Sequence, residues 1–288
     1  MKILVTTDGS ERSLCVLPHA ARFATATGAR LTLMRVLDPR TDAAGEVAPK
    51  LEEALERVRG RWAGELRETL AARAIDGDVH IAERAWGEDV PAAIHRAADD
   101  LQATILAMDS RGAGAIRHAL FGSVTMGVIS RADLPVMTLG GCPPVPGYDG
   151  KYHLLITSDG SPDALSVVDG LGKILSPGTV RVTLLEVAVM KALEPEAEAE
   201  ARALASLQPL RDRLPGGVEA EMVVRVVPPG AGIDTTIATA AKDLRADAIA
   251  SATHGHSARR HLVAGSTALG VVKLADVPVI LVKSHAVA

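Results

Sequence analysis

The chain has 288 residues, of which 48% are hydrophobic and only 2% aromatic, and its net charge is −4 from 31 basic and 35 acidic side chains. This length suits one large domain or two ordinary ones. The lack of a basic surplus and of aromatic platforms argues against nucleic acid as a partner, and no apolar run is long enough to span a bilayer, so no membrane partner is expected.

The first residues, Lys2–Thr7, form a short apolar run that is typical of a strand covered on both faces. The run meets a carboxylate before a secretory apolar region is complete, so we expect a cytoplasmic protein. Asp8-Gly9-Ser10 then predicts a turn, with Ser10 as the N-cap of a helix. We expect this helix to end near Thr27 and to kink at Pro18.

The rest of the first half alternates strands with helices. Apolar residues at spacings of three and four from Leu51 to Leu70 mark one face of a long helix. The expected strands are 31–36, 79–82, 105–108 and 136–139, and the expected helices are 49–74, 89–101 and 124–131. A Pro/Gly-rich stretch follows, so we place a linker at 141–150 between a first domain at 1–140 and a second at 151–288.

The second half repeats this order. Its expected strands are 153–157, 180–187, 219–227, 248–251 and 279–282, with helices starting near Pro162 and spanning 194–213, 233–244 and 269–274. Strands that alternate with helices imply right-handed crossovers. Each half is therefore expected to be an α/β domain with a doubly wound, open parallel sheet of five strands, a Rossmann-like fold. Ligands bind such sheets at the carboxyl ends of the strands, where the strand order reverses.

Two features recur at those carboxyl ends. Asp8 and Asp159 each begin an Asp-Gly-Ser turn. A glycine is also followed, after nine residues, by a Gly-Ser pair; the residues are Gly112, Gly122 and Ser123 in the first half and Gly255, Gly265 and Ser266 in the second. Glycine lets the backbone approach a ligand closely, and a helix start offers unpaired N–H groups at the positive end of the macrodipole. The pattern predicts a phosphate-binding cradle in each half.

With these residues the chain resembles a tandem universal stress protein, over about residues 1–140 and 151–284. The resemblance implies a Rossmann-like fold of the adenine nucleotide alpha hydrolase type. It implies that Asp8 and Asp159 hold the adenine and ribose of ATP. It also implies that Val36 and Val187 place main chain against adenine, and that the glycine loops and their serines hold the phosphates, with Mg²⁺.

The halves differ at the loop position where the family's ATP-binding members have their first glycine. The first half has Asp109 there and the second has Ala252. Because a carboxylate near the phosphates repels them, we expect ATP to bind more tightly in the second half. His254, His256 and His261 have no cysteine or carboxylate at ligand spacing, so no metal site is expected.

The expected function is ATP binding in a stress response or in signalling. Neither cradle has the lysine of a Walker loop or an acid placed to orient a water, so any hydrolysis should be slow. A scaffold that keeps the fold without nucleotide and acts by protein pairing is the alternative. An adenylyl transferase would need a catalytic lysine or a Gly-Gly-Asp-Ser loop, which Asp8-Gly9-Ser10 does not supply.

The last strands of the two halves, 136–139 and 279–282, are short and apolar and are expected at sheet edges. Unpaired backbone groups at such edges seek a partner strand. Members of the resembled family pair these strands, so we expect the two halves to pair within the chain. The same kind of edge also allows a homodimer.

Overall fold

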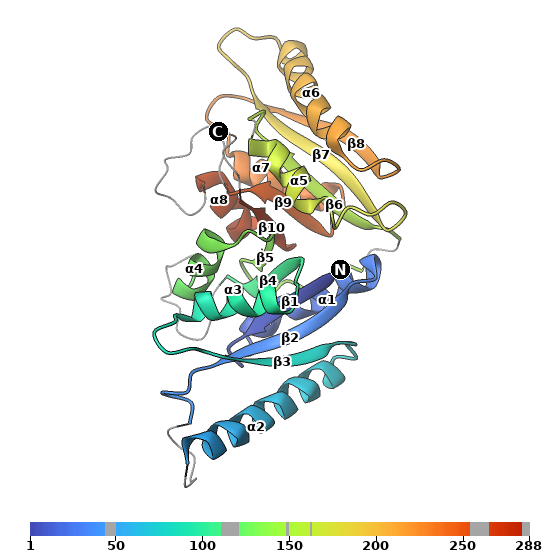
Figure 1. The fold of residues 1–288 in the computed structure, drawn as a ribbon. Helices are drawn as coiled ribbons and strands as arrows, with labels where there is room; N and C mark the ends of the chain where they lie inside the picture. Colours follow the sequence, from blue (N-terminus) through green and yellow to red (C-terminus); the bar gives the residue numbers. More distant parts are fainter. Residues whose placement is uncertain (44–49, 111–120, 148–149, 162, 254–264, 284–288) are drawn as a thin grey trace. The chain divides into compact units, whose positions relative to one another are not determined.

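The computed structural model describes residues 1–43, 50–110, 121–147, 150–161, 163–253 and 265–283. The chain forms two compact units, Met1–Ala132 and Asp133–Ala288, and in each one helices pack against a sheet of mainly parallel strands (Figure 1). The succession of strands and helices in the first unit recurs in the second. The doubly wound α/β fold predicted from the sequence is confirmed.

In the described part of the first unit, four parallel strands lie in the order β3-β2-β1-β4. The elements are β1 Lys2–Thr7, α1 Leu17–Thr27, β2 Arg30–Leu37, α2 Leu51–Ala72, β3 Asp78–Glu83, α3 Val90–Asp100, β4 Ile105–Asp109 and α4 Ser123–Arg131. The central strands β1 and β4 are buried along nearly their whole length. Strands covered on both faces need such continuous apolar runs, which is why the sequence shows no alternation there.

In the described part of the second unit, the strand order is β5-β10-β9-β6-β7-β8. The elements are β5 Val136–Leu139, β6 Tyr152–Ser158, α5 Asp163–Leu171, β7 Val180–Val189, α6 Glu196–Arg213, β8 Glu219–Val227, α7 Ile233–Asp243, β9 Ala248–Ala252, α8 Ser266–Leu274 and β10 Val279–Val282. The pairs from β10 to β8 are parallel. The first and fourth strands of the repeat, β6 and β9, are neighbours, as β1 and β4 are in the first unit.

The strand β5 pairs with β10 in antiparallel orientation, with Met137 opposite Ile280. The expectation that these two short apolar strands pair is confirmed. Gly140 directly follows β5 and lies against α8. A β-carbon built on Gly140 would lie 1.9 Å from the carbonyl oxygen of Val272, so this contact has no room for a side chain.

The helix α2 is amphipathic, as its spacing predicts, and it buries Val58, Trp62, Leu66 and Leu70. Leu51, which the sequence pattern assigned to the same face, is 60% exposed. It is the first residue of the helix and precedes the first buried position, Ala54, so the apolar face starts one turn later. Apolar side chains at helix ends often remain exposed, and the periodicity alone does not distinguish them.

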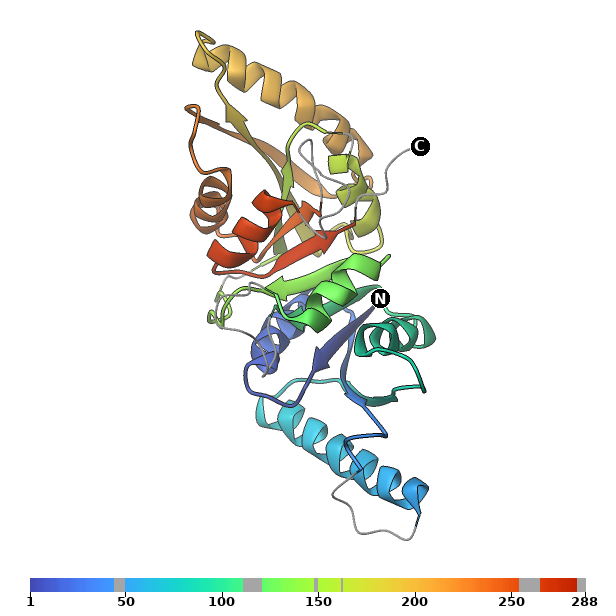
Figure 2. The same cartoon turned by 90° about the vertical axis from the view of Figure 1, so that its left-hand side faces the viewer.

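In the second unit the long helix α6, gold in Figure 2, packs along β7 and β8. Its buried residues are Ala199, Ala203, Leu207 and Leu210, at spacings of three and four. Its opposite face is charged and exposed. Among the described helices, none combines the length and the apolar character that a membrane crossing requires.

The kink expected at Pro18 does not occur. A 3₁₀ turn at Ser13–Val16 precedes the helix, and α1 begins only at Leu17. Pro18 therefore lies in the first turn of the helix, where its missing N–H removes no hydrogen bond. The helix ends as predicted, at Gly28, whose φ is +66°.

Glycines set the distance between two pairs of helices. A β-carbon on Gly127 of α4 would lie 2.6 Å from Cγ of Pro91 on α3, and one on Gly270 of α8 would lie 2.1 Å from Oδ2 of Asp234 on α7. The first pair lies side by side in Figure 1. Because each glycine is the fifth residue of its helix, the close contact is a repeated feature of the fold.

The N-terminus of α3 carries an acid-sensitive contact. Asp89 is its N-cap and accepts a hydrogen bond from the Ala92 N–H at 2.9 Å, and Arg131 donates to both of its carboxylate oxygens, at 2.5 and 2.7 Å. These bonds, those from Arg131 first, lower the pKa of Asp89 from 3.8 to about 2. A carboxylate with a depressed pKa adds stability above its unfolded-state pKa and loses that contribution as the pH falls through the folded-state value.

We expect Asp89→Asn to be less stable than the unaltered chain at neutral pH and to lose less stability as the pH falls from 3.8 to 2. Urea unfolding of both proteins across this pH window measures the difference. Parallel curves for the two proteins would contradict this assignment of the acid-sensitive contact.

Candidate nucleotide-binding crevices

In each unit the strand order reverses at one point, between the first and the fourth strand of the repeat. In the first unit, Val5 of β1 lies in register with Leu33 of β2 on one side and with Ala107 of β4 on the other. In the second unit, β6 has the same position between β7 and β9. Because all these strands are parallel, their carboxyl ends meet at one edge, and open α/β sheets bind their ligands at such an edge. This edge of each unit is called its crevice below.

The turn after β1 is held by its own side chains. Asp8 Oδ1 accepts hydrogen bonds from the Ser10 N–H at 3.0 Å and from Ser10 Oγ at 2.6 Å. The Ser10 hydroxyl in turn accepts the Ser13 N–H at 3.2 Å. Ser10 is not the N-cap that the sequence predicted, because the 3₁₀ turn has Arg12 as its N-cap and α1 has Val16. Gly9 has a φ of +88°, which other residues rarely adopt. The turn therefore presents an exposed carboxylate at the crevice.

The turn after β6 has the same geometry. Asp159 Oδ1 accepts the Ser161 N–H at 3.0 Å, and Gly160 has a φ of +75°. The Gly160 N–H donates to Ser158 Oγ at 3.0 Å, just as the Gly9 N–H donates to Thr7 Oγ1 at 3.0 Å. Asp159 is exposed, as Asp8 is. The two aspartates predicted to hold ribose and adenine thus occupy equivalent places in the two units.

The loops after β4 and β9 close in the same way. The Gly122 N–H donates to the Ser110 carbonyl at 2.8 Å, and the Gly265 N–H donates to the Thr253 carbonyl at 2.6 Å. Each glycine is the N-cap of the following helix, and neither cap has a side-chain hydrogen bond. The helices α4 and α8 therefore start at Ser123 and Ser266, and the N–H groups of their first turns can donate hydrogen bonds to an anion.

These two glycines do not need a left-handed backbone. Gly122 has a φ of −71° and Gly265 a φ of −66°, values that any residue adopts. A β-carbon on Gly265 would make only an ordinary contact with the described residues, at 3.5 Å from the Thr253 carbonyl oxygen. The described residues around Gly265 thus leave room for a side chain in front of the helix start.

In the first unit, the Asp109 side chain at the leading loop position is not placed as the sequence suggested. The Asp109 side chain is 1% exposed, and the Arg12 Nε–H donates to its Oδ1 at 3.1 Å. Its charge is therefore compensated by a cation from the segment that follows β1. In the second unit Ala252 is half-buried at the equivalent place. The predicted repulsion between Asp109 and phosphates loses its basis, because the carboxylate is buried and paired.

Comparison with known proteins places this arrangement in one family. The model of the universal stress protein family matches residues 1–139 and again residues 152–283. The chain belongs to the universal stress protein family. It is a tandem member, because both halves match the family model.

Individual relatives agree with this assignment. A universal stress protein encoded in the QAH/OAS sulfhydrylase 3' region of Thermus aquaticus is 30% identical over 135 residues, which are 47% of this chain and 95% of that protein. A universal stress protein of Archaeoglobus fulgidus has a TM-score of 0.65 at 19% identity, with 99% of this chain and 98% of that chain covered. A putative universal stress protein of Pseudomonas aeruginosa has a TM-score of 0.56 at 16% identity, with 98% and 92% covered. The two structures share the fold along the whole tandem chain.

In this universal stress protein the predicted valines lie at the carboxyl ends of the strands beside β1 and β6. Val36 of β2 is half-buried and lies opposite Ala82 of β3. Val187 of β7 is half-buried and lies opposite Arg225 of β8. Both are on the strand next to the Asp-Gly-Ser turn, at the same edge of the sheet.

The residues directly before these valines, Arg35 and Glu186, carry no recognisable motif in the sequence. Arg35 stacks on Trp62 of α2, with its guanidinium carbon 3.5 Å from the ring centroid. Glu186 is buried and accepts a hydrogen bond from the hydroxyl of Ser206 on α6. Their position directly before the predicted valines could have indicated that they lie near the site. Their contacts with helix residues could not be predicted, because strand patterns do not show which helix residues pack against them.

Two predicted site residues, Gly112 and Gly255, lie outside the described residues, as do His254, His256 and His261. Within the described ranges no cluster of three or more histidine, cysteine or carboxylate side chains could hold a metal ion. The described parts of the two crevices therefore consist of the Asp-Gly-Ser turns, the strand ends, and the helix starts at Ser123 and Ser266.

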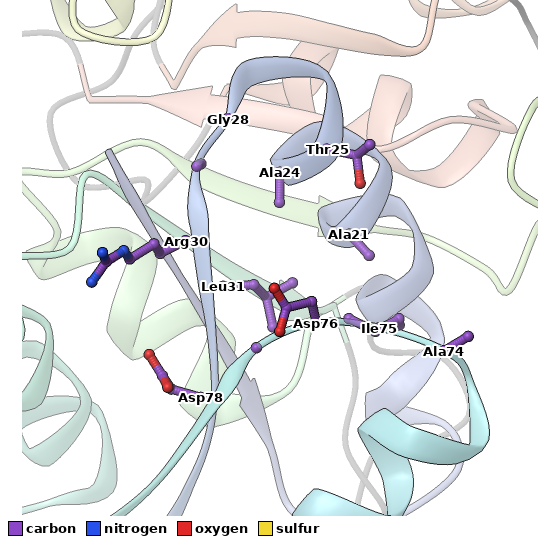
Figure 3. Close-up of a pocket in the computed structure, with 12 residues that line it drawn as sticks. Ala21, Ala24, Thr25, Gly28, Arg30, Leu31, Ala74, Ile75, Asp76 and Asp78 are labelled. Atoms are coloured by element: carbon purple, nitrogen blue, oxygen red, sulfur yellow. The ribbon is translucent and has the colours of Figure 1, made fainter.

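A cleft of about 640 Å³ lies elsewhere in the first unit, at the amino ends of β2 and β3 (Figure 3). Small side chains of α1, such as Ala21 and Ala24, line one side, and Arg30, Asp76 and Asp78 contribute charged groups. None of the predicted nucleotide-binding residues in the described ranges lines this cleft. It is separate from the crevice, which lies at the opposite ends of the strands.

Proposed function

We propose that this universal stress protein binds ATP, together with Mg²⁺, at the carboxyl ends of the parallel strands, and that it acts in a stress response or in signalling. The observation that supports this most directly is the repeated geometry of the two crevices. In each unit an Asp-Gly-Ser turn and a glycine-capped helix start flank neighbouring strands at the point where the strand order reverses.

The residues divide into two groups according to their chemistry. Asp8 and Asp159 offer carboxylate oxygens for the ribose hydroxyl groups, and the main chain at Val36 and Val187 offers hydrogen bonds to adenine. The second group faces the phosphates and consists of Gly112, Gly122, Ser123, Ala252, Gly255, Gly265 and Ser266. Backbone N–H groups and hydroxyls at a helix start suit phosphate oxygens, and the macrodipole adds to this attraction.

The protein is proposed to bind ATP rather than to turn it over rapidly. The loop segments 111–121 and 254–264 contain no lysine, and the transfer of a phosphoryl group depends on cations and a positioned base at the γ-phosphate. A slow ATPase remains compatible with bound Mg²⁺. Because β5 and β10 already pair with each other within the chain, they would not supply free strand edges for the association of two chains.

The test is the nucleotide content of the folded, purified protein. We expect mass spectrometry of the small molecules released by denaturation to detect ATP or ADP, and titration calorimetry on the stripped protein to show that ATP rebinds. Protein with a native far-UV circular dichroism spectrum that neither retains nor rebinds nucleotide would instead support a scaffold that acts by pairing with other proteins.

A further inference from the structure

The two crevices carry opposite charges at one equivalent position. Arg35 lies in register with Thr7, the last residue of β1, and Glu186 lies in register with Ser158, the last residue of β6. Each therefore reaches the edge where the Asp-Gly-Ser turn begins. At this register position, β2 of the first unit thus has a cation and β7 of the second unit has a carboxylate.

Arg35 lies directly beneath the turn of the first unit. A β-carbon built on Gly9 would lie 2.8 Å from its Nη1 and 2.9 Å from its guanidinium carbon. The guanidinium is held against Trp62, and its carboxylate partner Glu65 is 3.6 Å away with a half-exposed side chain. Burial lowers the pKa of Arg35 below its ordinary value, although the nearby carboxylates Glu65, Asp42 and Asp8 act in the opposite direction. Arginine remains protonated in proteins.

Glu186 has the corresponding place in the second unit. Its Oε1 would lie 3.9 Å from a β-carbon on Gly160, and its other oxygen accepts the Ser206 hydroxyl. The residue is only 6% exposed. The nearby Arg202 donates to Glu194 at 3.1 Å from both Nε and Nη2, and it also attracts Glu186 electrostatically. The wall beneath this turn therefore contains a buried acidic group where the first unit has a guanidinium.

The neighbouring positions continue the contrast. The segment after the turn contains Arg12 in the first unit and Asp163 in the second. The neighbouring strand ends with Asp109, which is paired with Arg12, in the first unit and with the uncharged Ala252 in the second. At the equivalent positions the first crevice thus has two cations and two carboxylates, whereas the second has three carboxylates: Asp159, Asp163 and Glu186.

We infer that the first crevice is the high-affinity site for ATP and that Arg35 and Glu186 determine the difference between the two sites. This inference rests on the proposed ATP binding. A polyanion such as ATP is attracted by a cation within a few Å of the turn and repelled by a carboxylate there, and low polarity strengthens both effects. The order of affinity is the reverse of the one that the sequence alone suggests from Asp109 and Ala252.

The experiment measures each crevice separately in the full-length chain. Gly265→Val blocks the second helix start and leaves the first crevice intact, and Gly122→Val does the opposite. Titration calorimetry with ATP at fixed Mg²⁺ and salt should show that the Gly265→Val chain binds ATP about tenfold more tightly than the Gly122→Val chain.

Neutral variants then test the two side chains. Arg35→Gln in the Gly265→Val background should weaken ATP binding about tenfold, and Glu186→Gln in the Gly122→Val background should strengthen it by a similar factor. Glutamine retains length and hydrogen-bonding capacity, including a contact with Ser206. Adenosine, which has no phosphate, should bind each variant with affinity unchanged within about twofold, and the ATP effects should shrink with added salt.

The outcomes separate the inference from the proposed function. Equal ATP affinities for the two site-blocked chains, or an affinity unmoved by Glu186→Gln and Arg35→Gln, would overturn the inference while ATP binding stands. Equal losses of ATP and adenosine binding in Arg35→Gln would assign Arg35 a structural role and also overturn it. Failure of the unaltered folded chain to bind ATP at all would overturn the proposed function itself.

Discussion

Replacing Gly265 by valine should abolish ATP binding at the second crevice without unfolding the second unit. The backbone at Gly265 has φ −66° and ψ 156°, which a β-branched residue adopts readily. A β-carbon there would touch only the Thr253 carbonyl oxygen among the described residues, at an ordinary 3.5 Å. The valine side chain would therefore occupy the space in front of the helix start, where the phosphates are proposed to bind.

The expected loss is large because hydrogen bonds to charged phosphate oxygens contribute about 1.5–3 kcal/mol each, so losing one or two of them weakens binding by about 100-fold. Calorimetry on a chain whose first crevice is blocked by Gly122→Val measures it. A suitable control is Gly64→Ala on α2, where a β-carbon meets no described atom within 4 Å. Retention of ATP binding in the chain that carries both Gly122→Val and Gly265→Val would show that the phosphates bind elsewhere.

Replacing Gly140 by alanine should strongly destabilise the second unit. The added β-carbon would lie 1.9 Å from the Val272 carbonyl oxygen and 3.2 Å from Cα of Lys273. Both atoms belong to the backbone of α8, so no side-chain rotation relieves the overlap, and either β5 or the helix must move. Such overpacking lowers the free energy of unfolding by about 1–3 kcal/mol.

The neighbouring glycine provides a matched control for this prediction. A β-carbon on Gly141 would meet only Cδ of Pro143, at 3.8 Å, so Gly141→Ala should have a stability close to that of the unaltered chain. Urea unfolding followed by circular dichroism compares the three proteins. Similar midpoints for Gly140→Ala and Gly141→Ala would mean that β5 does not pack against α8 in the way described.

Most of the fold was predictable from the sequence because strands that are covered on both faces and amphipathic helices leave clear local patterns. The runs at Lys2–Thr7 and Ile105–Met108 became β1 and β4, although β4 extends to Asp109. Pro18 was misplaced because a 3₁₀ turn and the start of a helix give the same local pattern as a longer helix. Such boundaries depend on tertiary packing more than on propensity.

The candidate site was less predictable, because several of its contacts join residues that are far apart in the sequence. The Asp-Gly-Ser turns were found because their hydrogen bonds join residues two or three positions apart. The pair of Arg12 with Asp109 joins residues 97 positions apart, and no local pattern indicates that the two side chains meet. The contact of Arg35 with Trp62 likewise depends on how α2 lies on the sheet, so the charge contrast between the crevices emerged only from the structure.

The stack of Arg35 on Trp62 gives one crevice an optical signal of its own. Both tryptophans of the chain, Trp62 and Trp86, belong to the first unit, and the second unit has no tryptophan. Trp86 is 90% exposed, whereas Trp62 is 8% exposed beneath the guanidinium. A ligand that draws Arg35 toward itself changes the electric field at the Trp62 indole and thereby its emission. In a Trp86→Phe chain, intrinsic fluorescence would consequently follow the filling of the first crevice in the unlabelled, intact protein.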